Sequence, residues 1–153
     1  MKKRLMSDPG FTLIELTTAA AIVVIALSGL LMLFARLSSM NENANNLTLA
    51  NIAIQDKMEE IKNFNFDTIL ATYNNTRFEP DGFAADQADG WIKVNQFSPG
   101  LLQVYISVSW RESSNRVIGE DKNLNGQLDG GEDLDSDNLL SSPARLITLI
   151  YPR

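Results

Sequence analysis

Oxygen-bearing side chains recur at short intervals near the C-terminus of the chain. Between residues 120 and 137 there are seven carboxylates and one basic residue, Lys122, so this stretch carries the same net charge, -6, as the whole 153-residue chain. Clustered carboxylates repel one another unless a cation lies among them, and carboxylate and amide oxygens are the ligands that hard divalent cations prefer. The regularly spaced oxygen donors are Asp121, Asn123, Asn125, Asp129 and Glu132.

The spacing of these donors matches the twelve-residue calcium loop of EF-hand proteins, with Gly126 at the position of the sharp turn. It predicts one bound Ca²⁺ between C-terminal strands, without the usual flanking helix pair. The side chains of Asp121, Asn123 and Asn125, the backbone carbonyl of Gln127, Asp129 (directly or through water) and both oxygens of Glu132 would bind the ion.

A second acidic run follows directly, but it matches the pattern less completely. Asp133, Asp135 and Asp137 begin the same spacing, whereas the twelfth position is Ala144. We interpret this run as additional negative charge around the first site or as a weak site. The plain alternative for the whole segment is a solvated acidic turn between strands.

The composition excludes several chemistries. The chain has no cysteine and no histidine, which rules out disulfides, thiolate metal sites and nucleophiles that depend on these residues. A sequence pI near 4.6 argues against nucleic acid as a partner, since phosphates are neutralised by clustered lysine and arginine. No pair of acids is placed by anything except the calcium loop, so we do not expect an enzyme.

A long apolar segment lies near the N-terminus, behind the basic residues Lys2, Lys3 and Arg4. Residues 16–35 contain no charge, and as a helix they would span roughly 30 Å, the thickness of a hydrocarbon core. The segment is longer than a typical signal-peptide core and lacks a small-residue cleavage site behind it. Glu15 at its start marks a functional position, because a carboxylate in lipid is costly.

The residues around Glu15 resemble the processing signal of type IV pilin-like proteins, which include pilins, minor pilins and type II secretion pseudopilins. The matching residues are Gly10, Phe11, Thr12, Leu13, Ile14, Glu15 and Leu16. The resemblance implies that a prepilin peptidase cleaves after Gly10, that Phe11 is then N-methylated, and that Glu15 pairs with the N-terminal amine of a neighbouring subunit. Major pilins usually carry a proline in the apolar helix, and its absence between Pro9 and Pro80 favours a minor subunit.

The remaining sequence predicts an α+β fold. An apolar stripe at helical spacing predicts the core face of a helix that packs on a small antiparallel sheet, and it consists of Leu47, Ala50, Ile54, Met58 and Ile61. Residues 64–89 are expected to be an irregular connection. Strands are predicted at 91–97, 101–110, 116–118 and 144–151, and a turn at 98–100 joins the first two. The even-numbered residues from 102 to 110 are expected on one face.

These features divide the chain into a leader (1–10), a transmembrane or filament-core helix (11–36) and a periplasmic or extracellular domain (37–153). We expect a structural minor subunit of a type IV pilus or a type II secretion pseudopilus, anchored by one helix in a bacterial inner membrane and reaching a filament or the cell surface after assembly. Its partners would be other subunits, prepilin peptidase and the inner-membrane assembly platform. The alternative is a membrane-anchored or secreted calcium-dependent binding or adhesion module.

Overall fold

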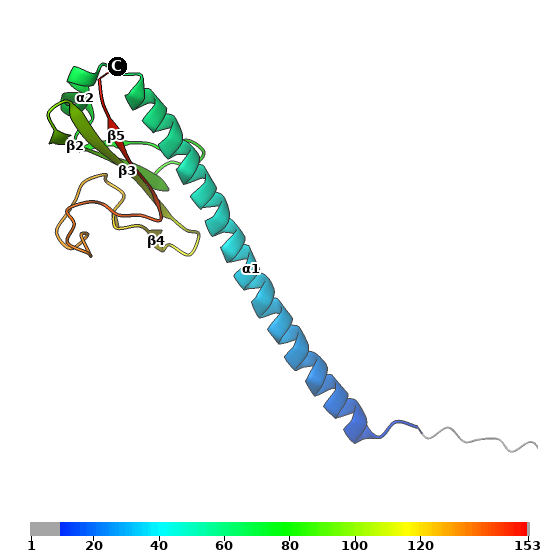
Figure 1. Cartoon of the computed structure of the whole chain (residues 1–153). Helices are drawn as coiled ribbons and strands as arrows, with labels where there is room; N and C mark the ends of the chain where they lie inside the picture. The colour runs from blue at the N-terminus through cyan, green and yellow to red at the C-terminus, as the bar shows by residue number, and fades with distance from the viewer. Residues whose placement is uncertain (1–9, 153) are drawn as a thin grey trace, which may run out of the picture. The chain divides into compact units, whose positions relative to one another are not determined.

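The computed structural model describes residues 10–152 and has the predicted α+β fold, a long N-terminal apolar helix and a small antiparallel sheet (Figure 1). The chain falls into two compact units, with the division between Asn41 and Glu42. In chain order the elements are α1 (Leu13–Lys62), α2 (Phe66–Tyr73), β1 (Thr76–Phe78), β2 (Ala88–Ser98), β3 (Leu101–Arg111), β4 (Val117–Ile118) and β5 (Ala144–Ile150).

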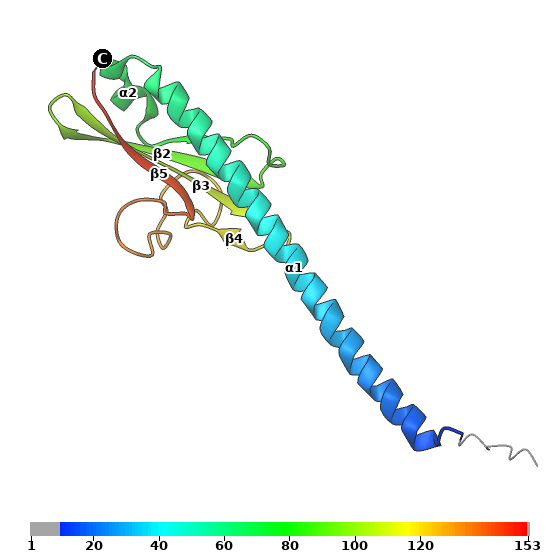
Figure 2. The same cartoon turned by 45° about the vertical axis from the view of Figure 1, so that its right-hand side comes forward.

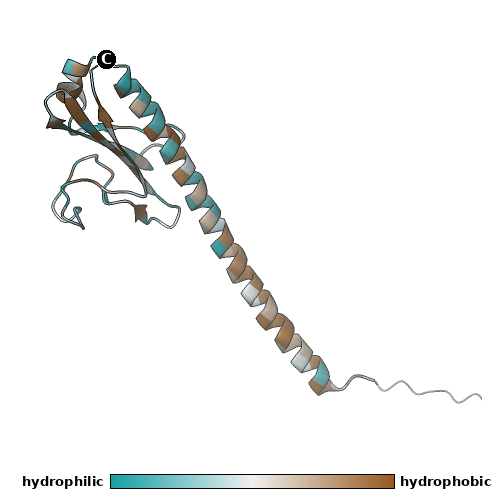
Figure 3. Cartoon of the chain, viewed as in Figure 1, coloured by the Kyte–Doolittle hydropathy of each residue, from teal (hydrophilic) through white to brown (hydrophobic). Residues whose placement is uncertain are grey.

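The first unit consists of the N-terminal part of α1, whose side chains are exposed throughout. Every residue from Gly10 to Asn41 is exposed, and the most apolar window has a mean hydropathy of 2.5 with none of it buried. In Figure 3 most turns of this part of the helix are brown, the colour of hydrophobic residues, with paler and teal turns among them. By length and composition, α1 is able to cross a membrane.

The second unit is built on five antiparallel strands (Figure 2). The sheet order is β1-β2-β3-β4, and β5 pairs with β3 on the same edge as β4. The predicted turn joins β2 to β3, where Gly100 adopts a φ of 77° that suits glycine. The long strands β2 and β3 pair over ten positions, and Val94 lies opposite Val104.

One face of the sheet packs against the C-terminal part of α1, as the apolar stripe predicts. Ala50, Ile54, Met58 and Ile61 are buried, and Leu47 packs against them. They contact alternate residues of the strands, namely Ile92, Val94, Leu102, Val104, Ile106, Val108, Trp110 and Ala144. The alternation along β3 therefore defines the helix-facing side.

The opposite face of β3 is also buried, although its side chains are more polar. Tyr105, Ser107 and Ser109 are each 3% exposed or less. The long connection between β4 and β5 covers them, and its Leu140 packs with Trp91 and Tyr105 in a second apolar cluster. The strand is thus enclosed between a helix and a loop.

The expectation of an irregular connection over residues 64–89 was wrong in its first half, where α2 and β1 form. Asn65 caps α2 by accepting a hydrogen bond from the Asp67 amide at 3.1 Å, and Ile69 and Tyr73, one helical turn apart, are buried. Helix α2 has only eight residues, which is too short for a helical pattern of apolar residues to be recognised in the sequence. The last strand also ends at Ile150, one residue before the predicted end.

Replacing Ile54 with alanine should lower the free energy of unfolding by about 2–5 kcal/mol, because it leaves a cavity between α1 and the sheet. The matched control is Ile52→Ala on the same helix, where the side chain is 50% exposed. Both tryptophans lie in the sheet, so the fluorescence of the full chain in detergent reports unfolding by denaturant. Equal losses for the two variants would contradict this packing.

Candidate functional site

The carboxylate of Glu15 lies at the first turn of α1, where it forms a capping box with Thr12. The Thr12 amide and hydroxyl both donate to Glu15 Oε2 at 3.3 Å, and the Glu15 amide donates to Thr12 Oγ1 at 3.3 Å. Gly10 and Phe11 precede the helix and Phe11 is 91% exposed, so the predicted cleavage junction is accessible. The rest of the predicted leader, residues 1–9, lies outside the described residues.

The predicted metal-binding residues lie in the connection between β4 and β5, which is fastened to the sheet at its base. The Glu120 amide donates to the Ser141 carbonyl at 2.9 Å, which closes the connection into a loop. The Tyr105 hydroxyl donates to the Leu140 carbonyl at 3.2 Å, and Ser107 donates to the same oxygen. Sheet contacts thereby hold both ends of the acidic segment.

In residues 121–132, the side-chain oxygens organise the backbone into a tight turn. Asp121 accepts hydrogen bonds from the Asn125 and Gly126 amides at 3.1 and 2.9 Å. Asn123 Oδ1 accepts from the Asn125 amide, and Asn125 Oδ1 accepts from the Gln127 amide. These bonds tie the side-chain oxygens at positions 121, 123 and 125 to the backbone of one turn.

The end of this run closes back on its beginning. Glu132, which is 5% exposed, accepts hydrogen bonds from the Lys122 and Asp129 amides at 2.9 and 3.1 Å. Asp129 Oδ2 accepts from the side-chain amides of Asn123 and Asn125 at 2.9 and 2.8 Å. The structure therefore brings together the side chains at 123, 125 and 129, and Glu132 joins the two ends. The backbone amide of Gln127 contacts Asn125, as described above.

The second acidic run repeats the hydrogen bonds of the first, twelve residues later. Asp133 accepts from the Asp137 and Asn138 amides, both at 3.0 Å, as Asp121 does from Asn125 and Gly126. Asp135 and Asp137 accept from amides two residues further on. The backbone agrees as well, with φ near +60° at the fourth and sixth positions of both runs, namely Leu124, Gly126, Ser136 and Asn138.

Glu120 gives the second run the closing carboxylate that its own sequence lacks at Ala144. It accepts hydrogen bonds from the Leu134 and Ser141 amides at 3.0 and 2.7 Å. These amides occupy the second and ninth positions of the second run, the positions that Glu132 contacts in the first. A carboxylate from the residue before the first run thus occupies the place that has no acid in the second run's own sequence.

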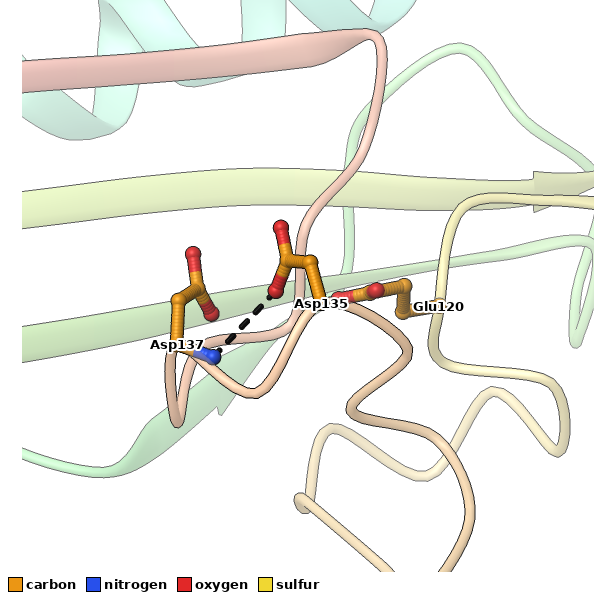
Figure 4. Close-up of side chains that lie close together, drawn as sticks. All are labelled: Glu120, Asp135 and Asp137. Atoms are coloured by element: carbon orange, nitrogen blue, oxygen red, sulfur yellow. Dashed lines mark hydrogen bonds between the residues drawn. The ribbon is translucent and has the colours of Figure 1, made fainter.

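Glu120, Asp135 and Asp137 form a group that could bind a metal ion. Ligand oxygens of the three side chains lie within 4.8 Å of one another, with Glu120 buried and the two aspartates exposed (Figure 4). The Asp137 amide donates to Asp135 Oδ1 at 3.3 Å, which fixes the two aspartates relative to each other. Oxygen donors of this kind suit Ca²⁺ or Mg²⁺.

Burial and hydrogen bonding shift the pKa values of the acids around the first run in opposite directions. Burial raises the pKa of Asp121, since its charged form loses solvent. Hydrogen bonds from Asn123 and Asn125 lower the pKa of Asp129. Beneath the loop, burial raises the pKa of Asp89 to about 6, although Arg77 opposes this shift. A cation in the loop would stabilise the charged form of Asp121 in particular.

Two residues of this region were not predicted from the sequence. The sequence does contain a signal for Glu120. The pair Glu120-Asp121 recurs twelve residues later as Glu132-Asp133, so a glutamate precedes each of the two acidic runs. Asp89 had no such signal, since it belongs to β2 and reaches the loop only through the folding of the sheet. Comparisons with family models, curated proteins and solved structures gave no match for this chain.

Replacing Gly126 with alanine should destabilise the loop by about 1–3 kcal/mol from backbone strain alone, since its φ is +64°. The added Cβ would also lie 2.5 Å from the Arg77 Cβ and 3.4 Å from both Asp89 carboxylate oxygens. Gly130→Ala is the control, because within residues 10–152 nothing beyond its chain neighbours lies within 4 Å of its added Cβ. Melting temperatures of the full chain in detergent should fall by several degrees for Gly126→Ala only; equal values would show that the loop does not pack on β1 and β2.

Proposed function

We propose that this protein is a structural minor subunit of a type IV pilus or a type II secretion pseudopilus, processed after Gly10 and assembled through α1. One observation carries the proposal: the exposed apolar part of α1 begins directly behind Gly10 and Phe11 and has Glu15 in its first turn. A surface this apolar is stable only in lipid or against other apolar helices. A subunit that moves from the membrane to a filament core uses both environments in turn.

The pairing of Glu15 with a neighbouring chain follows from the cost of charges in an apolar environment. A carboxylate inside the hydrocarbon core is costly unless a partner neutralises it, and Glu15 lies in the first turn of the apolar helix. Thr12 satisfies one oxygen of Glu15 but carries no charge. Cleavage after Gly10 would create a charged amine on Phe11, and this amine on one chain would neutralise Glu15 on the next.

Calcium in the 121–132 loop would stabilise the C-terminal part of the domain. The support lies in the buried carboxylates of Asp121 and Glu132 and in the convergence of Asn123, Asn125 and Asp129. Without a cation, seven acids in residues 120–137 repel one another directly before β5. With no disulfide possible in a chain that lacks cysteine, an ion supplies the cross-link. The domain would lie in the periplasm before assembly.

Glu15→Gln should reduce the amount of this subunit in sheared filaments at least tenfold, because the amide cannot neutralise the amine of Phe11. Thr12→Val is the control: it removes the hydroxyl part of the capping box and keeps the carboxylate. Quantitative mass spectrometry measures incorporation, and the intact mass of the assembled wild-type subunit should correspond to a methylated chain that starts at Phe11. Wild-type incorporation of Glu15→Gln, or assembled subunits that retain residues 1–10, would contradict the proposal.

Chelation should lower the melting temperature of the full chain in detergent, and added Ca²⁺ should restore it. At a hundredfold excess over Kd, binding to the folded state adds about 2.7 kcal/mol of stability. Glu132→Gln should abolish most of this response, whereas Glu59→Gln, on an exposed position of α1, should retain it. Calorimetry without calcium uptake, together with melting that is unchanged by chelator, would show that the segment is a plain acidic turn.

A further inference from the structure

A cavity of about 490 Å³ lies where strands β1 and β2 meet the acidic loop. Its volume is within the range of sites for small ligands, roughly 300–1,000 Å³. Arg77, Trp91 and Lys93 line it from the strands, while Gln127 from the first acidic run and Asn138 from the second line it from the loop. The cavity is separate from the carboxylate group of Glu120, Asp135 and Asp137.

The charge of this cavity is opposite to that of the protein. The chain has a net charge of -6, yet two cationic side chains, Arg77 and Lys93, are among the described residues that line the cavity, and no aspartate or glutamate is. The side-chain amides of Asn75, Gln127 and Asn138 add groups that can both donate and accept hydrogen bonds. Such a lining favours a polar anion over a cation or an apolar molecule.

Arg77 is held in place from behind by a buried carboxylate. Its Nη2 atom lies 3.1 Å from Asp89 Oδ2, and the Asp89 side chain is fully buried whereas the Arg77 side chain is 53% exposed. A guanidinium group has five N–H donors in a fixed plane, so most remain for a ligand after the contact with Asp89. The ion pair keeps the guanidinium group beside Asp89 before any ligand arrives, which lowers the entropy cost of binding.

Lys93 is positioned by a hydrogen bond to an uncharged side chain, and Arg77, Lys93 and Asp89 together carry a single positive charge. Its ammonium group donates to Asn75 Oδ1 at 2.9 Å, which leaves two donors. Arg77 and Lys93 are positive, and Asp89 is negative at neutral pH. The complement of this set is an anion of charge -1, and a planar carboxylate matches the guanidinium fork best.

We propose that this cavity binds the carboxylate of a small polar molecule, either an acidic sugar or an acidic amino-acid side chain of a peptide. The carboxylate contacts Arg77 and Lys93, and the hydroxyl or amide groups of the ligand contact Gln127 and Asn138. This binding site goes beyond the role in filament assembly and does not require it.

Calcium in the first acidic run should strengthen carboxylate binding, and this part alone rests on the proposed calcium site. Gly126, Gln127 and Leu128 form one wall of the cavity, so a cation that orders the run also orders that wall. The ion also neutralises acids of the run that would otherwise repel an anion.

Calorimetry on the full chain in detergent at pH 7.5 tests the proposal with two matched pairs of probes. Glucuronate and the amide of N-acetylglutamate carry one carboxylate each, whereas glucose and the amide of N-acetylglutamine are their neutral counterparts. At least one acid should bind, and its neutral counterpart should bind at least tenfold more weakly. Stronger binding of glucuronate identifies an acidic sugar, and stronger binding of the glutamate derivative identifies an acidic side chain. Heats that are equal for the charged and neutral probes, or absent for both acids, would overturn the proposal.

Variants test whether the acid binds in this cavity or only responds to the overall charge of the chain. Lys93→Gln should weaken binding of the acid about tenfold or more, whereas Lys62→Gln, which removes the same charge from the end of α1, should change it less than twofold. Arg77→Gln combined with Asp89→Asn removes the ion pair without leaving a buried charge, and it should abolish binding while the melting temperature shows a folded chain. Equal affinities of the Lys93 and Lys62 variants would overturn the site.

Titrations with chelator and with calcium test the cavity independently of the calcium proposal. Carboxylate binding in both conditions supports the cavity even if the chain takes up no calcium.

Discussion

Strand β3 must be covered on both faces, and the rest of the domain is arranged to do this. It pairs with β2, β4 and β5, and its residues from Leu102 to Trp110 are buried except for Gln103, which is only half-buried. On one face the cover is the apolar stripe of α1, so burial of aliphatic side chains stabilises that contact without directional bonds. On the other face the cover is the loop of residues 119–143, where Leu140 is buried and Leu128 and Leu139 pack beside it. That side depends on hydrogen bonds from Tyr105, Ser107 and Ser142 to backbone carbonyls.

The acidic loop that covers the sheet places many carboxylates close together, and hydrogen bonds within the loop offset part of the cost. Its carboxylates accept hydrogen bonds from backbone amides, which offsets the loss of solvent at Asp121, Glu120 and Glu132. Hydrogen bonds cannot remove the repulsion between the acids, however, and a bound cation would. A metal ion would therefore complete the interaction that covers the second face of β3. This links the proposed calcium binding to the stability of the fold rather than to a sensor-type movement.

The two units of the chain are stabilised by different interactions. From Glu42 onward the side chains have a core of their own, which contains every buried residue in the described part of the chain. Before it, α1 buries nothing and is stabilised by its internal hydrogen bonds and by the Thr12–Glu15 cap. The exposed apolar surface of the first unit needs a partner, whether lipid or protein. This difference supports the proposal that the first unit anchors and assembles while the second presents a surface with the loop and its cavity.

The sequence by itself determined the elements whose signals are local. The stripe from Leu47 to Ile61, the alternation along β3 and the turn at Gly100 were predicted, because periodicity and turn chemistry are properties of short segments. Helix α2 was missed because eight residues show little more than two turns of a repeat. Only the tertiary structure decided that the loop covers the second face of β3, that Glu120 closes the second acidic run, and that Asp89 positions Arg77. Each of these contacts joins residues separated by other elements, and their geometry depends on how the strands pair and not on any local pattern.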